Sequence, residues 1–197
     1  MNHKRLIISG NRSYGLAHSL SKIFPSAEFF SRSSSNSNFA RAEDRRLFAQ
    51  KSLDYDVYIN CSCLAQFRQT LLLEEVYKKW REKNKKGQIL CLGSTADTPV
   101  KGTSWIYPIE KKALRNYCRN LSLAALGDQG SPPSGIRVTY VSPGYLTTPK
   151  MEEKTPDVDK IDTDYLAGII GWLIEQPANV NISEFCLDPI QVRHELP

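Results

Sequence analysis

The chain has 197 residues, which fits one large domain or two small ones, and we predict a single domain over residues 1–197. With 41% apolar, 24% charged and 10% aromatic residues, the composition excludes a disordered, collagen-like or coiled-coil protein. No apolar run approaches the roughly 18 residues that a membrane-spanning helix needs, and no secretory signal pattern is found. We therefore expect a cytoplasmic protein with no membrane partner.

The sequence carries 26 basic and 21 acidic residues, a net charge of +5, which favours polyanions without requiring one. Part of the excess is a basic cluster that ends at Gly87, formed by Lys78, Lys79, Arg81, Lys83, Lys85 and Lys86. We interpret it as the solvated end of a helix, with Gly87 as a left-handed cap. A nucleic-acid patch is the alternative, but only Tyr77 and Trp80 would supply stacking rings, so we predict no nucleic-acid partner.

Cysteine and histidine usage indicates a reducing compartment and no metal. There are five Cys, and the closest pair, Cys61 and Cys63, does not have redox-motif spacing. The three His lie far apart with no Cys or carboxylate cluster near them, so we expect no zinc site.

Apolar runs and helical patterns alternate along the chain. In chain order we predict a strand at 4–9, a glycine turn and helix at 10–24, a strand at 27–31, a turn at 33–38, a helix at 41–52, a strand at 55–61, a helix at about 64–84, a strand at 88–94, a helix at 107–126, a loop at 127–134, a strand at 136–142, a surface loop or lid at 150–162, a helix at 163–175 and a strand at 180–187.

This alternation predicts a doubly wound α/β fold, with a mostly parallel sheet and helices on both faces. Ligands of such sheets bind at the carboxyl ends of the strands. The candidate positions are therefore the strand ends: Ser9-Gly10, Ser31-Arg32, Asn60-Cys61, Gly93-Ser94 and Ser142-Pro143-Gly144.

The first strand end is a glycine turn that runs into a helix, from Gly10 to Ala17. Such a turn lets a pyrophosphate approach the amino terminus of the helix. The candidate contacts are Gly10, Asn11, Arg12, Ser13, Gly15 and Leu16. The glycine spacing is one residue longer than in common dinucleotide fingerprints, so a plain strand-to-helix turn is an equal alternative for this motif alone.

A second group of residues has the pattern of an acid/base site. Tyr107 follows Ser94 by thirteen residues, and Lys111 lies one helical turn beyond Tyr107. A cation near a phenol favours the phenolate, and a serine hydroxyl can hold a substrate oxygen beside it, which describes proton transfer at a carbonyl or alcohol oxygen. The alternative is a surface Tyr–Lys pair on an amphipathic helix.

The order of these motifs over nearly the whole chain resembles the short-chain dehydrogenase/reductases. The match includes the glycine turn, Asn60, Ser94, the Tyr107–Lys111 pair and the segment from Ser142 to Thr148. The resemblance implies a nicotinamide dinucleotide cofactor and hydride transfer. The resemblance also implies residue roles: Tyr107 as acid/base, Lys111 on the nicotinamide ribose and lowering the pKa of Tyr107, Ser94 orienting the substrate, Thr148 near the carboxamide, and Asn60, Pro143 and Gly144 around the cofactor.

The charges after the second predicted strand favour NADP over NAD. That strand ends in Ser31-Arg32-Ser33, with no Asp or Glu to repel a 2′-phosphate, and Arg12 and Arg32 are predicted to flank the phosphate with Ser33 beside them. Each arginine taken alone has a plain alternative as a solvated side chain.

The chain departs from the family pattern in three places. The third strand is shortened around Asn38-Phe39, and the family's fourth catalytic position, an Asn, falls near Gln66. The turn after Asn60 is unusual, so that Asn60 has an alternative role as a turn residue.

We predict an NADP(H)-dependent oxidoreductase for a carbonyl or alcohol substrate, forming a homodimer or homotetramer through the helices at 64–84 and 107–126. The alternative is a dinucleotide-binding sensor with little activity.

Overall fold

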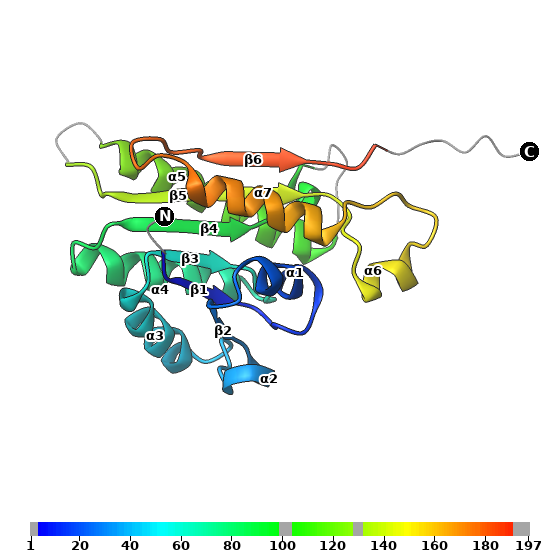
Figure 1. The fold of residues 1–197 in the computed structure, drawn as a ribbon, viewed down its shortest axis with the longest axis horizontal. Coiled ribbons are helices and arrows are strands. Elements are labelled where there is room, and N and C mark those ends of the chain that lie inside the picture. Colours follow the sequence, from blue (N-terminus) through cyan, green and yellow to red (C-terminus); the bar gives the residue numbers. More distant parts are fainter. Residues whose placement is uncertain (1–3, 99–103, 128–131, 191–197) are drawn as a thin grey trace, which may run out of the picture.

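The computed structural model describes residues 4–98, 104–127 and 132–190. Six parallel strands form one sheet in the order β2-β1-β3-β4-β5-β6 (Figure 1). The strands are β1 (Leu6–Ser9), β2 (Glu28–Phe30), β3 (Val57–Asn60), β4 (Gly87–Leu92), β5 (Ile136–Pro143) and β6 (Glu184–Leu187). The predicted doubly wound fold is confirmed.

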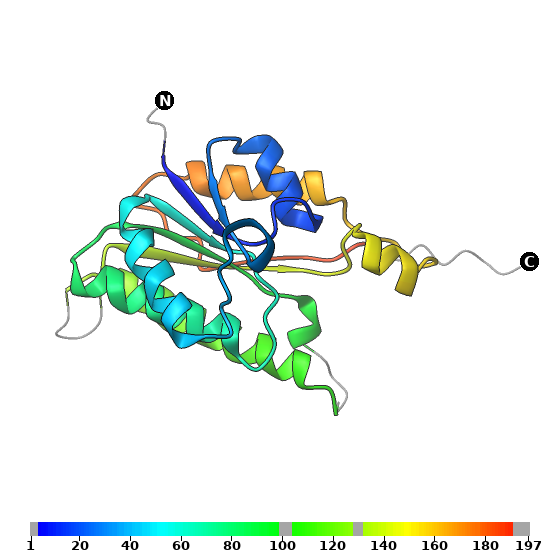
Figure 2. The same cartoon turned by 90° about the horizontal axis from the view of Figure 1, so that it is seen from below.

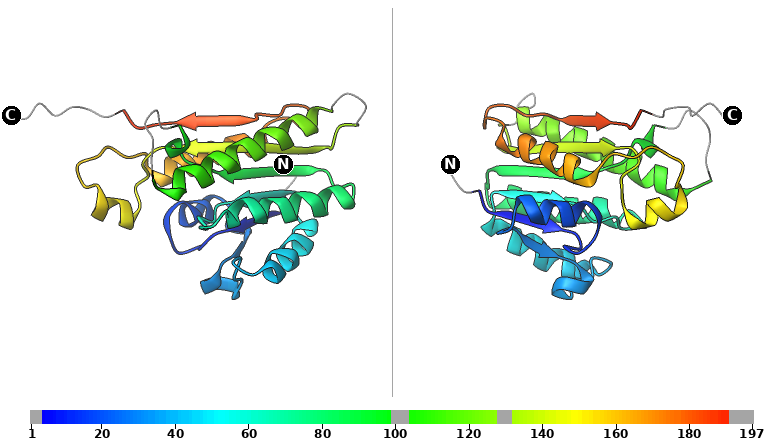
Figure 3. Two further views of the ribbon diagram at one scale, coloured as in Figure 1. Left: turned by 180° about the vertical axis from the view of Figure 1, so that it is seen from behind. Right: turned by 45° about the vertical axis from the view of Figure 1, so that its right-hand side comes forward.

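Helices cover both faces of the sheet (Figures 2 and 3). The first face carries α1 (Gly15–Ile23) and α7 (Thr163–Glu175), which pack on each other, and the second carries α3 (Ala42–Lys51), α4 (Arg68–Glu82) and α5 (Ile106–Leu126). Alternate residues of each strand point to opposite faces, so Ile8 and Ile59 pack under α1 and α7, whereas Ile7 and Tyr58 pack under α4. The short elements are α2 (Arg32–Ser35), η1 (Ser52–Asp54), η2 (Thr95–Asp97) and α6 (Pro149–Lys154).

Several predicted boundaries shift for identifiable reasons. The helix expected from about residue 64 begins at Arg68, because Gln66 and Phe67 have φ of 61° and 57°, which a right-handed helix cannot include. The helix ends before Asn84, and Asn84, with a φ of 49°, has the left-handed conformation that was expected of Gly87. Gly87 is not a helix cap; it is the first residue of β4.

Two predicted loops contain a short helix. Residues 33–38 overlap α2, which Ser31 caps by accepting a hydrogen bond from the backbone N–H of Ser34. The segment 150–162 includes most of α6, which is capped in the same way by Thr148. The last strand is shorter than expected, and of the loop predicted at 127–134, residues 128–131 lie outside the described residues.

The outer edge of the sheet lacks a strand. In the doubly wound dinucleotide-binding fold, the third strand lies outside the second. Here residues 36–41 form no strand, and the chain passes from α2 directly to α3, so β2 is the edge (Figure 1). The shortening expected around Asn38-Phe39 is thus a complete replacement of that strand by turns.

None of the helices in the described part of the chain combines the length and apolar character needed to cross a bilayer.

Candidate functional site

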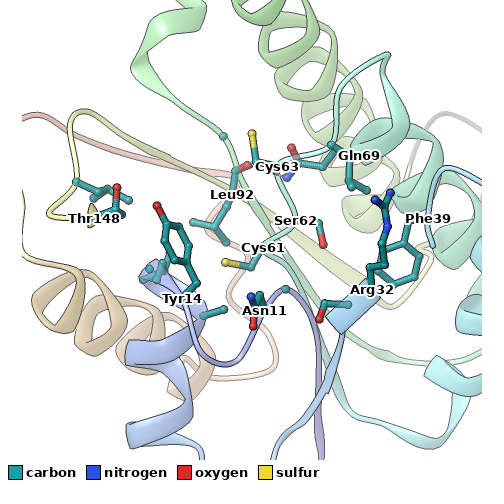
Figure 4. Close-up of a pocket in the computed structure, with 18 of the residues that line it drawn as sticks. Asn11, Tyr14, Arg32, Phe39, Cys61, Ser62, Cys63, Gln69, Leu92 and Thr148 are labelled. Atoms are coloured by element: carbon teal, nitrogen blue, oxygen red, sulfur yellow. Dashed lines mark hydrogen bonds between the residues drawn. The ribbon is translucent and has the colours of Figure 1, made fainter. Parts of the chain in front are cut away.

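A cavity of about 510 Å³ lies at the carboxyl ends of the strands. Its wall runs from the glycine turn, past the ends of β2, β3 and β4, to α5 and the segment before α6 (Figure 4). Predicted residues that line it are Gly10, Asn11, Gly15, Leu16, Arg32, Tyr107, Lys111, Pro143 and Thr148. Ser94 and five of the predicted cofactor contacts, Arg12, Ser13, Ser33, Asn60 and Gly144, are not part of this lining.

The glycine turn brings its backbone close to the sheet and to α1. A Cβ at Gly10 would lie 3.1 Å from the Cβ of Ala17, which leaves no room for a larger residue without a shift. Gly15, the first residue of α1, has a φ of +54°, a conformation that favours glycine. Asn11 closes the turn by accepting a hydrogen bond from the backbone N–H of Ser13 at 3.0 Å. The backbone is therefore open to the cavity at the amino terminus of α1.

The two arginines predicted to flank one phosphate have different surroundings. Arg32 lines the cavity and donates a hydrogen bond to the Oδ1 of Asn38 at 3.2 Å. The guanidinium of Arg12 instead lies over the ring of Phe29, 5.4 Å from its centroid, and outside the cavity lining. The expectation that Arg12 flanks the same ligand as Arg32 is not met, since the face of Phe29 holds its side chain elsewhere.

Tyr107 and Lys111 line the end of the cavity at α5, and Ser94 lies next to Tyr107 just outside the lining. The ammonium of Lys111 lies over the Tyr107 ring, 5.6 Å from its centroid. Burial raises the pKa of Tyr107 above its ordinary value of 10.0, although the nearby side chain of Ser94 acts in the opposite direction. Lys111 is not among the main causes of this shift, and its lowering of the pKa stays a prediction.

Lys111 is held by a glutamine that sequence reasoning missed. Its ammonium donates to the Oε1 of Gln69 at 2.7 Å and to the backbone carbonyl of Leu92 at 3.1 Å. The amide nitrogen of Gln69 donates to the carbonyls of Asn60 and Leu92, which fixes the amide with its oxygen toward Lys111. Burial lowers the pKa of Lys111.

Gln69, and not Gln66, faces the cavity and Lys111. Gln66 is exposed and lies in the left-handed turn before α4, whereas Gln69 is 4% exposed and lines the cavity. The apolar face of the helix contained a signal for this difference, because Gln69, Leu72 and Leu73 share one buried side at helical spacing.

Asn60 has a structural role beneath the cavity. It is fully buried, accepts a hydrogen bond from the Ser9 hydroxyl at 3.2 Å, and donates one to the Gln69 carbonyl at 3.1 Å. The alternative of a satisfied turn residue describes it better than direct cofactor contact. The residues that follow it, Cys61 and Cys63, line the cavity instead, and burial raises the pKa of Cys61 to about 12.

The segment after β5 closes the opposite wall. Thr148 stands across from Tyr14 of the glycine turn (Figure 4), and the Tyr14 hydroxyl accepts a hydrogen bond from the backbone N–H of Lys150 at 3.3 Å. Gly144 packs away from the cavity, where a Cβ would lie 2.4 Å from the Oδ1 of Asp188. Tyr14 was not predicted, because an aromatic residue inside a glycine turn has no counterpart in the common fingerprints.

We expect Gln69→Leu to lower the free energy of unfolding by about 3 kcal/mol, because it removes the acceptor of a buried ammonium and the donor to two buried carbonyls. Urea unfolding measures this loss. The matched control is Gln66→Ala, which changes an exposed glutamine three residues away and should stay within about 0.5 kcal/mol of the unsubstituted protein. Equal effects of the two substitutions would contradict the assignment of Gln69 as the anchor of Lys111.

Comparison with known proteins agrees with the fold. No model of a known protein family matches the sequence. An uncharacterized oxidoreductase of Staphylococcus epidermidis is 26% identical over 110 residues, which cover 55% of this chain and 45% of the relative. A second, from Staphylococcus saprophyticus, is 27% identical over 109 residues, which cover 53% and 42%. The matches thus span less than half the length of these relatives.

Solved structures match over nearly the full length. A short-chain dehydrogenase/reductase family protein superposes with a TM-score of 0.73 at 15% identity, covering 94% of this chain and 96% of the other. A 4-hydroxyisoleucine dehydrogenase complexed with NADH gives 0.69 at 19% identity, with 94% and 97% covered. A 3-ketoacyl-(acyl-carrier-protein) reductase from Brucella melitensis complexed with NADH gives 0.68 at 16% identity, also with 94% and 97% covered. The chain therefore has the fold of the short-chain dehydrogenase/reductases, the family that its motifs resemble.

Proposed function

We propose that the protein is an NADP(H)-dependent oxidoreductase that interconverts a carbonyl and an alcohol, with Tyr107 as the acid/base. The observation that carries this proposal is the convergence of Ser94, Tyr107 and Lys111 at the end of a cavity that begins at the glycine turn. A phenol, a hydroxyl and an ammonium at the carboxyl edge of a parallel sheet form a proton-transfer site next to a dinucleotide site.

The cavity residues fit a nicotinamide dinucleotide. The turn from Gly10 to Gly15 would hold the pyrophosphate with its backbone, and Arg32 would face the adenosine ribose. Lys111 has two of its three N–H groups bonded to Gln69 and Leu92, which leaves one for a ribose hydroxyl. When bound, the nicotinamide supplies or accepts the hydride.

The raised pKa of Tyr107 favours the direction of reduction. At neutral pH the phenol is protonated, so it can donate its proton to the carbonyl oxygen of a substrate as that oxygen becomes an alcohol. Ser94 would hold the same oxygen through its hydroxyl. In this reaction Tyr107 would therefore donate one proton, and Ser94 would orient the carbonyl oxygen of the substrate.

The first experiment is a titration with NADPH and NADH, followed by nicotinamide fluorescence, and then a panel of carbonyl compounds with NADPH consumption as the readout. Binding together with turnover supports the oxidoreductase. Failure of both cofactors to bind at millimolar concentration would rule out the proposal.

A dinucleotide-binding sensor is the second candidate. One observation favours it: burial raises the pKa of Tyr107, so the chain does little to activate the phenol as a base. Tight binding with no turnover across the panel would select this alternative.

We expect a dimer or tetramer in solution. The paired helices α4 and α5 expose large apolar side chains, among them Leu71, Ile109, Leu123 and Leu126, which are 38–66% exposed in one chain. A second copy would remove this surface from water. Light scattering at micromolar concentration should give a multiple of 22.3 kDa, and a mass of one chain would contradict this expectation.

A further inference from the structure

A buried tyrosine lies directly beneath Ser94. Tyr140 of β5 is fully buried, and a Cβ added at Gly93 would lie 1.9 Å from its ring, so the residue before Ser94 has to be glycine. The ring places its hydroxyl under the end of β4, where it accepts a hydrogen bond from the backbone N–H of Ser94 at 3.3 Å. Gly93 and Tyr140 are thus a matched pair.

The hydroxyl of Tyr140 continues into a charged pair. It donates its proton to the Oδ2 of Asp97 at 2.7 Å, and the Oδ1 of Asp97 accepts from Arg115 at 3.1 Å. Asp97 is 1% exposed, and a buried carboxylate needs such partners to offset the loss of its hydration. Arg115 also forms an ion pair with Glu184 of β6, which fixes the outer end of the chain of contacts.

The same contacts fix the hydroxyl of Ser94 as well as its backbone. Asp97 and Ala96 belong to the single turn η2, and the N–H of Ala96 donates to the Oγ of Ser94 at 3.2 Å. The Oγ of Ser94 is thus fixed by the backbone of η2, and its side chain lies beside Tyr107, whose pKa it lowers. Ser94 is therefore held at two atoms by groups that depend on Tyr140 and Asp97.

We propose that Tyr140, Asp97 and Arg115 form a positioning network that holds the Ser94 side chain in place beside Tyr107. The catalytic importance of this contact rests on the proposed function, but the geometry of the network does not. Tyr140 acts on the site through Ser94 and also donates a weak hydrogen bond to the backbone carbonyl of Lys111 at 3.4 Å. No member of the network touches the glycine turn or the Lys111 ammonium, so we expect the network to affect the substrate end of the cavity and to leave cofactor binding unchanged.

The test is a double-mutant cycle with Tyr140→Phe, Ser94→Ala and the combination. Tyr140→Phe keeps the ring against Gly93 and removes only the hydroxyl. The ionisation of Tyr107 is followed by NMR of 13C-labelled tyrosine, with its signal assigned from Tyr107→Phe. The other groups that act on Tyr107, Cys63, Asp97, Glu110 and Lys111, remain in every variant.

Because the Ser94 side chain lowers the pKa of Tyr107, both single variants should raise this pKa. In the Ser94→Ala background, Tyr140→Phe should add nothing. Additive shifts, or no shift in Tyr140→Phe, would show that Tyr140 only packs against Gly93 and would overturn the proposal.

Turnover provides a second readout with the same logic. Tyr140→Phe should lower kcat about tenfold with the Kd of NADPH unchanged, and should cause no further loss in Ser94→Ala. Arg115→Met breaks the network at its outer end and should act in the same direction, whereas Arg115→Lys should restore most of the rate. These two variants also keep the test decisive if Tyr140→Phe does not fold.

The control is Tyr55→Phe, which removes the hydroxyl of a buried tyrosine just before β3 and should move neither readout. If the unsubstituted protein shows no turnover, the proposed function fails, whereas the NMR cycle still decides on the network. The two failures are therefore distinguishable.

Discussion

Tyr107→Phe should abolish turnover, with a loss of about 100- to 10,000-fold in kcat, while the Kd of NADPH stays within about tenfold of that of the unsubstituted protein. The substitution keeps the ring under the Lys111 ammonium and removes only the hydroxyl, which carries the proton that the reaction needs. Steady-state kinetics and nicotinamide fluorescence measure the two quantities separately. The control is Tyr165→Phe on α7, which is 65% exposed and not part of the cavity lining. Retained turnover in Tyr107→Phe would remove Tyr107 from the mechanism.

The pH dependence of reduction should follow from the same phenol. The protonated form of Tyr107 is the active one, so the rate is present below its pKa and is lost as the pH rises through it. Because burial raises that pKa above 10.0, kcat for reduction should stay level through neutral pH and fall only in the strongly alkaline range. A fall in kcat as the pH rises through neutrality, if it disappears in Tyr107→Phe, would mean that the pKa of Tyr107 is lowered, and would contradict this expectation.

The second large effect concerns the choice of cofactor. NADPH should bind more tightly than NADH, because Arg32 lines the cavity after β2 and no carboxylate of that strand end opposes a phosphate. A charge-assisted pair contributes about 1.5–3 kcal/mol, and since Arg32 is exposed we expect the lower value, about tenfold in Kd. Arg32→Asp should shift the ratio further, because it repels the phosphate and offers an acceptor to ribose hydroxyls.

Arg12→Asp is the matched control for that experiment. It makes the same change of charge in an arginine that is also exposed but lies over Phe29 and outside the cavity lining. Titration of both cofactors should therefore show a much smaller change in the NADPH-to-NADH ratio than Arg32→Asp produces. If the unsubstituted protein prefers NADH, or if both aspartate variants behave alike, the electrostatic argument for NADP is wrong.

The alternation of strands and helices was predictable because apolar periodicity sets it. The two isoleucines of β1, for example, face opposite sides of the sheet and are both fully buried, as a parallel strand covered on both faces requires. Placing the site at the strand ends follows from the same pattern. The order of strands then brings residues 10, 60 and 93, far apart in sequence, to one edge of the sheet.

The errors arose where a single backbone angle or a distant partner decides the outcome. Gln66 and Gln69 differ by three positions, and only the left-handed turn at Gln66 and Phe67 determines which glutamine enters the helix facing Lys111. Arg12 is directed by the ring of Phe29, a neighbour that exists only once β1 and β2 have paired. The role of Tyr140 required knowing that Gly93 leaves room for its ring.

The absence of an outer strand beyond β2 has a consequence for solubility. A free sheet edge exposes unpaired N–H and C=O groups, which can recruit the edge of another molecule and start aggregation. β2 limits this risk by its shortness, since it has only three residues and is followed at once by the helical turn of α2. Its first residue, Glu28, is exposed and lies 3.9 Å from the ammonium of Lys51, so the edge also carries charge. Lengthening β2 with β-branched residues or neutralising Glu28 would therefore favour aggregation through this edge.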